Sequence, residues 1–97
     1  MQVNFSWRHL EPSKAMQDII NTKLAKLEKF SKRISSIDVI LTQEGARNEV
    51  EFQIRLRKAP TFIVKEQSYD MYVALNSCLS RAKRKVKQYE SEVRGRK

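Results

Sequence analysis

Between Glu49 and Arg57, apolar residues alternate one by one with charged and amide residues. Successive side chains of a β-strand point to opposite faces, so this period of two predicts a strand with one apolar and one solvent-exposed face. An apolar sheet face must be covered by a second layer, which the rest of the chain has to supply. The apolar residues of this strand are Val50, Phe52, Ile54 and Leu56.

Two segments with helical periodicity can form the covering layer. Apolar side chains recur every three or four positions in residues 14–30, and Ser13, after Pro12, is a suitable N-cap for this helix. A second apolar stripe follows from Ser68 onward and continues for about six turns. We expect both helices to pack on the same face of the sheet. The second stripe comprises Met71, Leu75, Cys78, Leu79, Ala82, Val86, Tyr89 and Val93.

Three further segments have the pattern of strands. Alternation around Phe5 and around Val39 predicts strands at 3–7 and 37–42, and residues 61–67 form a short fourth strand. The short turns at 44–47 and 58–60 make the last three strands antiparallel neighbours. The predicted fold class is α+β with the order β-α-β-β-β-α: a four-stranded sheet with two helices packed on one face, resembling a double-stranded RNA-binding domain with an added strand.

The composition excludes several kinds of chemistry. A chain of 97 residues predicts one domain, 1–97, without a separate catalytic domain. Cys78 and His9 are the only cysteine and histidine, so neither a disulfide nor a zinc site is expected, and Cys78 is interpreted as a buried apolar residue. Glu49 and Glu51 share the exposed strand face, which does not indicate catalysis. We therefore predict no enzyme, no metal, no cofactor and no small-molecule substrate.

The chain also lacks the sequence signals of membrane insertion or export. No segment approaches the roughly 18 consecutive apolar residues that a membrane span requires, and the first ten residues lack the apolar run of a signal peptide. We expect a cytoplasmic protein that does not bind a membrane.

The positive charge is concentrated at the end of the chain. The formal net charge is +9, and the last 17 residues carry eight of the 20 basic side chains but only two of the 11 acidic ones. Such a run can be an ordinary solvated helix face, but neighbouring like charges destabilise a helix, and a partner explains them better. Phosphates of a nucleic acid are the natural partner.

Helix geometry arranges these cations around the apolar stripes. On the last helix, Arg81, Arg84, Lys85 and Gln88 lie on one flank, and Lys83 and Lys87 lie on the other. On the first helix, Lys26 and Lys29 point away from the core, and Arg33 lies just past its end. Lys23 falls within the apolar sector. It either extends its stem along the core or lines the seam between the helices and joins Arg81 and Arg84 in one basic surface.

Tyrosines add a possible contact to bases. Tyr69 and Tyr72 could stack on unpaired bases, whereas Tyr89 lies in the apolar stripe and is expected in the core.

Several strings resemble the ribosome hibernation promoting factor family, which includes the ribosome-associated inhibitor called protein Y. One is Lys23-Leu24-Ala25-Lys26-Leu27-Glu28 with Phe30 and Arg33-Ile34 after it. The other is Asp70-Met71-Tyr72-Val73-Ala74-Leu75, followed by Arg81 and Arg84. The resemblance covers essentially the whole chain, which departs from the family's usual pattern at Pro12 and Lys14, where the first helix opens. The chain ends in a basic tail, about residues 94–97, and in this respect it resembles the short form of the family.

The resemblance implies a bacterial, stress- and stationary-phase ribosome-binding protein. Family members occupy the channel of the small subunit that messenger and transfer RNA use, block translation, protect idle ribosomes and, in the short form, favour inactive ribosome dimers. By position, the resemblance implies that Lys23, Lys26, Arg33, Arg81 and Arg84 contact ribosomal RNA phosphates, and helix geometry adds Lys29, Lys83, Lys85, Lys87 and Gln88. The expected partners are the small subunit with its RNA and whole ribosomes, and the free protein is expected to be monomeric.

Two alternatives remain open. A generic double-stranded RNA-binding module shares much of this element order, but its terminal helix starts with a lysine cluster, whereas this chain has Ser68-Tyr69-Asp70. A protein-interaction module that modulates a transcription factor would place the basic helix on an acidic protein surface and would bind without RNA.

Overall fold

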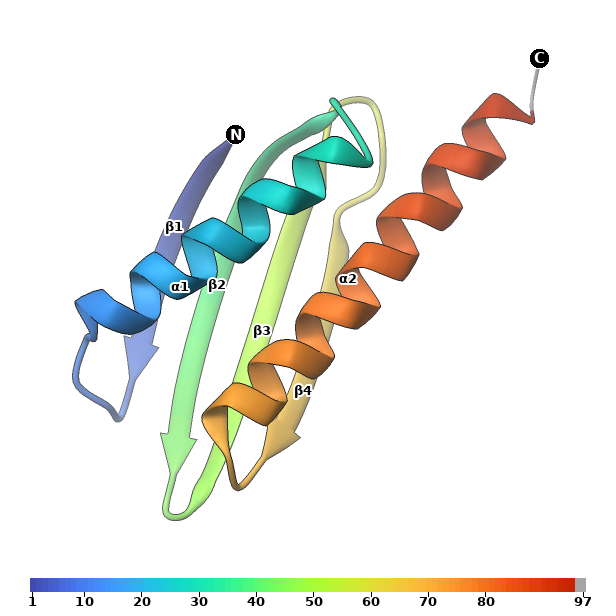
Figure 1. The fold of residues 1–97 in the computed structure, drawn as a ribbon. Helices are drawn as coiled ribbons and strands as arrows, with labels where there is room; N and C mark the ends of the chain where they lie inside the picture. Colours follow the sequence, from blue (N-terminus) through green and yellow to red (C-terminus); the bar gives the residue numbers. More distant parts are fainter. Residues whose placement is uncertain (96–97) are drawn as a thin grey trace.

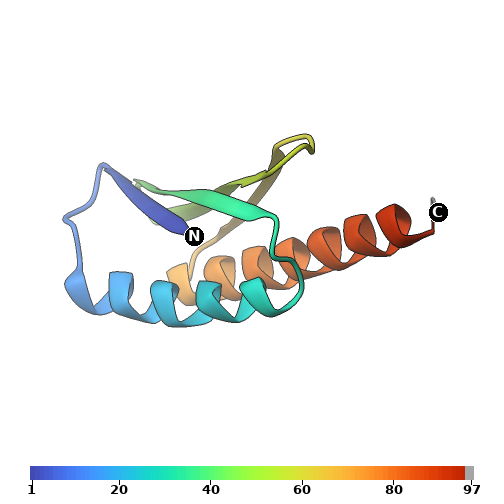
Figure 2. The same ribbon diagram turned by 90° about the horizontal axis from the view of Figure 1, so that it is seen from above.

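In the computed structural model, which describes residues 1–95, four strands form one sheet and two helices cover one of its faces (Figure 1). The strands are β1 (Gln2–Arg8), β2 (Ile34–Glu44), β3 (Arg47–Leu56) and β4 (Phe62–Ser68). The helices are α1 (Lys14–Ala25), the 3₁₀ turn η1 (Lys26–Lys29) and α2 (Met71–Arg94). The predicted element order and the predicted helical layer are confirmed (Figure 2).

The sheet is mixed, with the order β1-β2-β3-β4. The β2–β3 and β3–β4 pairs are antiparallel, as predicted from the short turns, whereas β1 runs parallel to β2 because α1 forms the crossover between them. The register aligns one apolar row across all four strands on the covered face. This row is Phe5, Val39, Phe52 and Val64.

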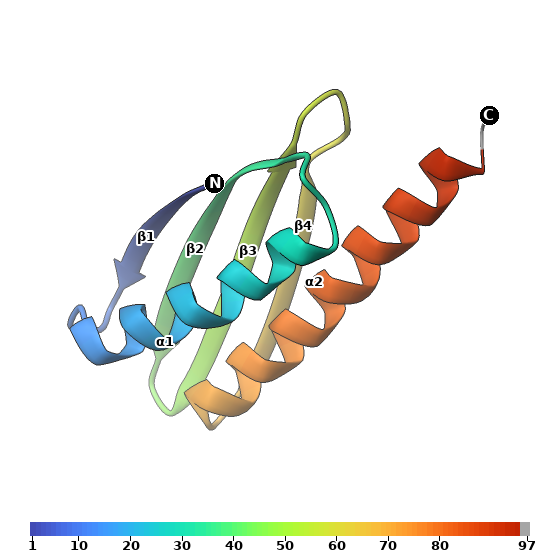
Figure 3. The ribbon, with the colours of Figure 1, turned by 45° about the horizontal axis from the view of Figure 1, so that its top comes forward.

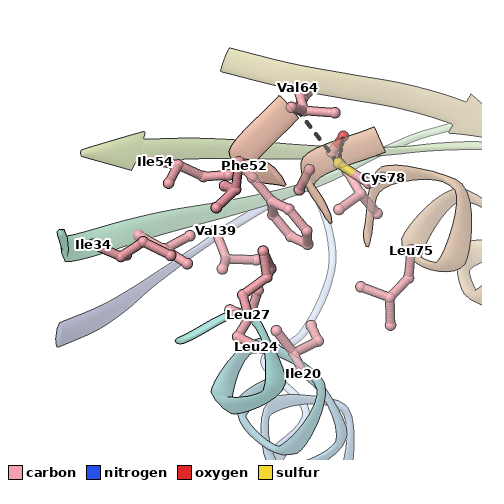
Figure 4. Close-up of a cluster of buried hydrophobic side chains, with 14 of the residues drawn as sticks. Ile20, Leu24, Leu27, Ile34, Val39, Phe52, Ile54, Val64, Leu75 and Cys78 are labelled. Atoms are coloured by element: carbon pink, nitrogen blue, oxygen red, sulfur yellow. Dashed lines mark hydrogen bonds between the residues drawn. The ribbon is translucent and has the colours of Figure 1, made fainter. Parts of the chain in front are cut away.

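The core lies between this face and the two helices (Figure 4). Ile20 and Leu24 of α1 are fully buried, and Leu27 of η1 is almost so. On α2 the fully buried side chains are Ala74, Leu75, Cys78, Ala82 and Val86. The interpretation of Cys78 as a buried apolar residue is therefore confirmed.

The two helices begin at side-chain caps. The hydroxyl of Ser13 accepts a hydrogen bond of 3.2 Å from the backbone N–H of Met16, which confirms the predicted cap and the start of α1 at Lys14. The carboxylate of Asp70 accepts one of 2.9 Å from the N–H of Tyr72. The predicted start of the last helix at Ser68 was therefore wrong, because Ser68 still belongs to β4 and Asp70 is the cap.

The predicted single helix over 14–30 was wrong in its last turn. The α-helix ends at Ala25, and the chain tightens into η1, where the N–H of Phe30 donates to the carbonyl of Leu27 over 3.0 Å. Apolar spacing could not reveal this change, because a 3₁₀ turn keeps Leu27 and Phe30 on the side that faces the core.

The other face of the sheet carries mostly polar side chains, several of which pair with one another. Asp38 accepts hydrogen bonds from Asn4 and Arg55, and these bonds lower the pKa of its carboxyl. The carboxylates expected on this face are also engaged, since Gln67 donates to Glu49 and Gln53 donates to Glu51. Two basic residues of this face, Arg55 and Lys65, are paired with Asp38 and Glu51.

The last turns of α2 extend beyond the edge of the sheet (Figure 3). Its 24 residues correspond to about 36 Å of helix, which contributes to a longest dimension of 49 Å for the molecule. No helix within residues 1–95 has an apolar stretch long enough to cross a bilayer.

Candidate nucleic-acid interface

A groove of about 520 Å³ runs along the seam between the two helices. Its floor is apolar and its rim carries four lysines, so it offers both hydrophobic contact and positive charge. We call it the interhelical groove. It is lined by Lys23, Lys26, Leu27, Lys29, Phe30, Asn76, Leu79, Ser80 and Lys83.

Phe30 organises one end of this groove. The ammonium nitrogens of Lys83 and Lys87 lie 5.1 and 5.2 Å from the centroid of its ring, within cation–π distance. Both lysines belong to α2, whereas Phe30 follows η1, so these contacts hold two cations of one helix against the other helical segment. The apolar spacing over residues 14–30 predicts a packing role for Phe30 but not these contacts with cations.

Lys23 is half-buried and lines the seam between the two helices. Its joining Arg81 and Arg84 in one basic surface stays a prediction. Across the groove it faces a wall that includes Asn76, Ser80 and Lys83. Arg81 and Arg84 lie in a separate depression, of which Asn76 and Ser80 form the shared border. The cations of the two depressions are therefore neighbours across a polar ridge on α2.

Arg81 is tied to the sheet. Its guanidinium donates a hydrogen bond of 3.1 Å to the carbonyl of Lys65 and lies 3.4 Å from the carboxylate of Glu66. This residue therefore connects α2 to β4, and part of its charge is already compensated. Arg84, one turn further along the helix, is exposed.

Arg33 also has an acidic partner. Its Nε lies 3.2 Å from Oε1 of Glu90, which also accepts a hydrogen bond from Ser31.

The remaining predicted residues are exposed on the helical layer. Lys85 and Lys87 belong to α2, as does Gln88, whose amide donates to Glu92 over 3.4 Å.

The groove lysines differ from these two arginines in being uncompensated. In the part of the chain that the structure describes, none of the four has a carboxylate within the 4.0 Å of an ion pair. Like charges that converge without counter-charges create a positive potential that attracts polyanions. The four lysines and the apolar floor give the groove its charge and its shape. Among residues 1–95, no cluster of three or more potential metal-ligating side chains occurs.

The three tyrosines divide into one packed and two exposed residues, as expected. Tyr89 packs edge-on against Phe62, with ring centroids 5.5 Å apart, whereas Tyr69 and Tyr72 are 73% and 48% exposed. Stacking of the exposed pair on bases stays a prediction. Of the predicted tail, Arg96 and Lys97 lie outside the described residues.

Sequence analysis missed three cations at the end of the sheet. Lys32, Arg57 and Lys58 lie in two connections that are distant in the chain, and they share a second depression with Arg94. No local pattern could reveal this, because the cluster forms only when the two connections meet.

The fold and the helical face thus define a small basic α+β domain with the features of a binding protein. The model of the family described as Sigma 54 modulation protein / S30EA ribosomal protein matches residues 3–94, and the chain belongs to this family. The names that the family description and the curated relatives carry, sigma 54 modulation protein, S30EA ribosomal protein and ribosome hibernation promoting factor, denote no class of enzyme.

Curated relatives and solved structures agree with this assignment. The chain is 29% identical over 94 residues to the ribosome hibernation promoting factor of Azotobacter vinelandii, covering 96% of this chain and 87% of that protein. With the factor of the same name from Salmonella typhimurium it shares 23% identity, covering 97% and 98%.

Two solved structures share the fold. The protein Y N-terminal domain of Thermus thermophilus matches with a TM-score of 0.79 and 25% identity, covering 91% of this chain and 94% of that one. A ribosomal subunit interface protein of Coxiella burnetii matches with a TM-score of 0.82 and 18% identity, covering 94% and 99%. The latter likeness supports the fold alone.

Proposed function

We propose that this protein is a ribosome hibernation factor that binds the small ribosomal subunit through its basic helical face. The observation that carries the proposal is the interhelical groove, whose four lysines have no carboxylate at ion-pair distance within residues 1–95. Family membership supplies the ribosome as the polyanion. Such a factor works in the cytoplasm, as a monomer when free.

The mechanism is steric. A preformed basic surface docks in a channel walled by ribosomal RNA and excludes messenger and transfer RNA, without any chemical step. The residues that face the RNA are those of the two-helix surface, together with Arg33 beyond the first helix. If six phosphates are engaged, counterion release gives a slope of roughly −4 to −5 for log K against log salt.

Co-sedimentation with purified ribosomes and small subunits tests this proposal. The expected result is saturable binding near one protein per ribosome, displaced by transfer RNA and weakly by duplex RNA. Weak, unsaturable binding that duplex RNA removes equally well would contradict it. The same gradients show whether inactive ribosome dimers accumulate.

A matched pair of variants locates the surface. Lys26→Gln with Lys83→Gln removes two exposed cations of the interhelical groove, and Lys14→Gln with Lys65→Gln removes two exposed lysines that lie outside it and are paired with Asp18 and Glu51. We expect the groove variant to lose affinity for ribosomes and the control to retain it. Equal losses would mean that only total charge matters.

One alternative has support from the family description, which also names modulation of sigma 54. In that function the basic helix would contact an acidic protein surface. Tight binding of purified sigma 54 without RNA, together with failure to bind ribosomes, would favour it. The double-stranded RNA alternative has less support, because α2 starts with Asp70 as its cap and with exposed Tyr69 and Tyr72.

A further inference from the structure

A second basic depression lies at the end of the sheet and is lined by residues of the α1–β2 connection, the β3–β4 turn and the last turns of α2. Its volume is about 550 Å³, and we call it the basic cup. Six of its lining residues are cations: Lys29, Lys32, Arg33, Arg57, Lys58 and Arg94.

The backbone holds the two connections of the basic cup together. The N–H of Arg57 donates to the carbonyl of Arg33 over 2.9 Å, and its guanidinium donates to the carbonyl of Lys32 over 3.2 Å. Lys58 adopts the left-handed conformation with φ 54°, which is disfavoured for a residue with a Cβ. The backbone positions of Lys32 and Lys58 are therefore set by the fold before any partner binds, while their side chains are exposed.

The charge of the basic cup is almost uncompensated. Glu90 is the one carboxylate among its lining residues, and its Oε1 is already engaged by Ser31 and Arg33. In residues 1–95, Lys29, Lys32, Lys58 and Arg94 have no carboxylate at ion-pair distance. Cations gathered in this way by a rigid backbone are suited to a multiply hydrogen-bonded anion such as a phosphate group.

The basic cup is adjacent to the interhelical groove. Lys29 and Phe30 line both depressions, so a strand that leaves the groove past Lys29 enters the cup directly. We propose that the basic cup is a second phosphate-binding site, which takes a backbone phosphate of the RNA strand whose neighbouring nucleotides occupy the groove. The choice of RNA as the anion rests on the proposed function.

A single-stranded RNA of ten nucleotides tests this site without ribosomes. The variant Lys32→Gln with Lys58→Gln removes two cations of the basic cup, and Lys14→Gln with Lys65→Gln is the control with the same change of charge. Affinity is measured by fluorescence anisotropy across a salt series. We expect the cup variant to bind severalfold more weakly with a salt slope reduced by about 0.7, the value for one single-strand phosphate, and the control to keep the wild-type slope.

Nuclear magnetic resonance of the full chain locates the contact. The backbone amide signals of Lys32 and Lys58 should shift on addition of the same RNA, along with those of the groove. Unchanged cup signals, or equal slopes for both double variants, would overturn the proposal. Failure of the wild type to co-sediment with ribosomes would overturn the proposed function instead, and the RNA titration would still decide whether the cup binds phosphate.

Discussion

The hydroxyl of Ser31 donates a hydrogen bond of 2.6 Å to the carboxylate of Glu90, which lies 59 positions further along the chain. Ser31 is buried and the Glu90 side chain is only 15% exposed. The bond joins the connection after η1 to the last turns of α2, which follow Val86, the last fully buried residue of this helix. It therefore fixes the helical layer at the point where the interhelical groove and the basic cup meet.

Substitutions at Ser31 and Glu90 should separate stability from binding. Ser31→Ala removes the hydrogen bond without changing charge, and we expect it to lower the free energy of unfolding by about 1 kcal/mol. Glu90→Gln keeps an acceptor but removes the negative charge from the basic cup, so it should increase RNA affinity. Urea denaturation and anisotropy measure the two effects. Glu92→Gln is the control with equal charge change, and an equal gain in affinity there would contradict a local effect of Glu90.

Arg81 and Arg84 should behave differently when reversed to glutamate. Arg84 is exposed and has no ion pair within residues 1–95, so Arg84→Glu should reduce ribosome affinity at unchanged melting temperature. Arg81→Glu places a second carboxylate beside Glu66 and loses the bond to the Lys65 carbonyl, so it should also lower stability, by about 1 kcal/mol. Thermal unfolding and co-sedimentation distinguish the two. Equal melting temperatures for both variants would show that the contacts of Arg81 do not stabilise the fold.

The ring of Phe30 should shift the nuclear magnetic resonance signals of two lysines. Because the ammonium groups of Lys83 and Lys87 lie near its centroid, the adjacent methylene protons should show ring-current shifts. Phe30→Leu should abolish these shifts and Phe30→Tyr should retain them. We expect Phe30→Leu to cost about 0.5–1 kcal/mol of stability from the cation–π contacts, in addition to any loss of packing. Unchanged lysine signals in Phe30→Leu would contradict the contact.

Cys78 should be unreactive in the folded protein. Burial raises the pKa of its thiol to about 12 from an ordinary value of 9.0, so the nucleophilic thiolate is scarce at neutral pH. Labelling with a thiol reagent at pH 8 should be at least about tenfold slower than in denaturant, since access also requires opening of the core. Rapid labelling of the native protein would show that α2 opens locally.

The same shift has a consequence for stability at high pH. An unfolded Cys78 ionises near pH 9 and the folded one only near pH 12, so the contribution of this group is complete below pH 9 and decreases as the pH rises from 9 to 12. Unfolding measured for the wild type and Cys78→Ala over this range should therefore show the steeper decrease in the wild type. Parallel curves would contradict the shifted ionisation.

The elements could be predicted from the sequence because their signals are local. The alternation around Phe52 and the cap at Ser13 each depend on a few neighbouring residues, and both were confirmed. The parallel pairing of β1 with β2 and the 3₁₀ turn at Lys26 were not anticipated, because the first depends on the path of the crossover and the second leaves apolar spacing unchanged.

In the candidate site, too, some features could be predicted from local patterns and others depend on contacts between distant residues. The separation of Lys83 from Arg81 around α2 follows from helix geometry, and the two residues line two different depressions. The ion pair of Arg33 with Glu90 and the meeting of Lys32 with Lys58 join residues that are far apart in the chain. Such contacts depend on tertiary structure, which no periodicity encodes.

The overhang of α2 affects how fast a partner can be captured. Its cations stand on a continuous helix that is already folded, so docking requires no ordering of the backbone and avoids that part of the entropic cost of binding. Encounter should then be governed by long-range attraction to phosphates, with an association rate that is high at low ionic strength and decreases steeply with added salt. Release, in contrast, should depend on the short-range contacts of the groove, so that residence time and capture rate can be tuned by different residues of one helix.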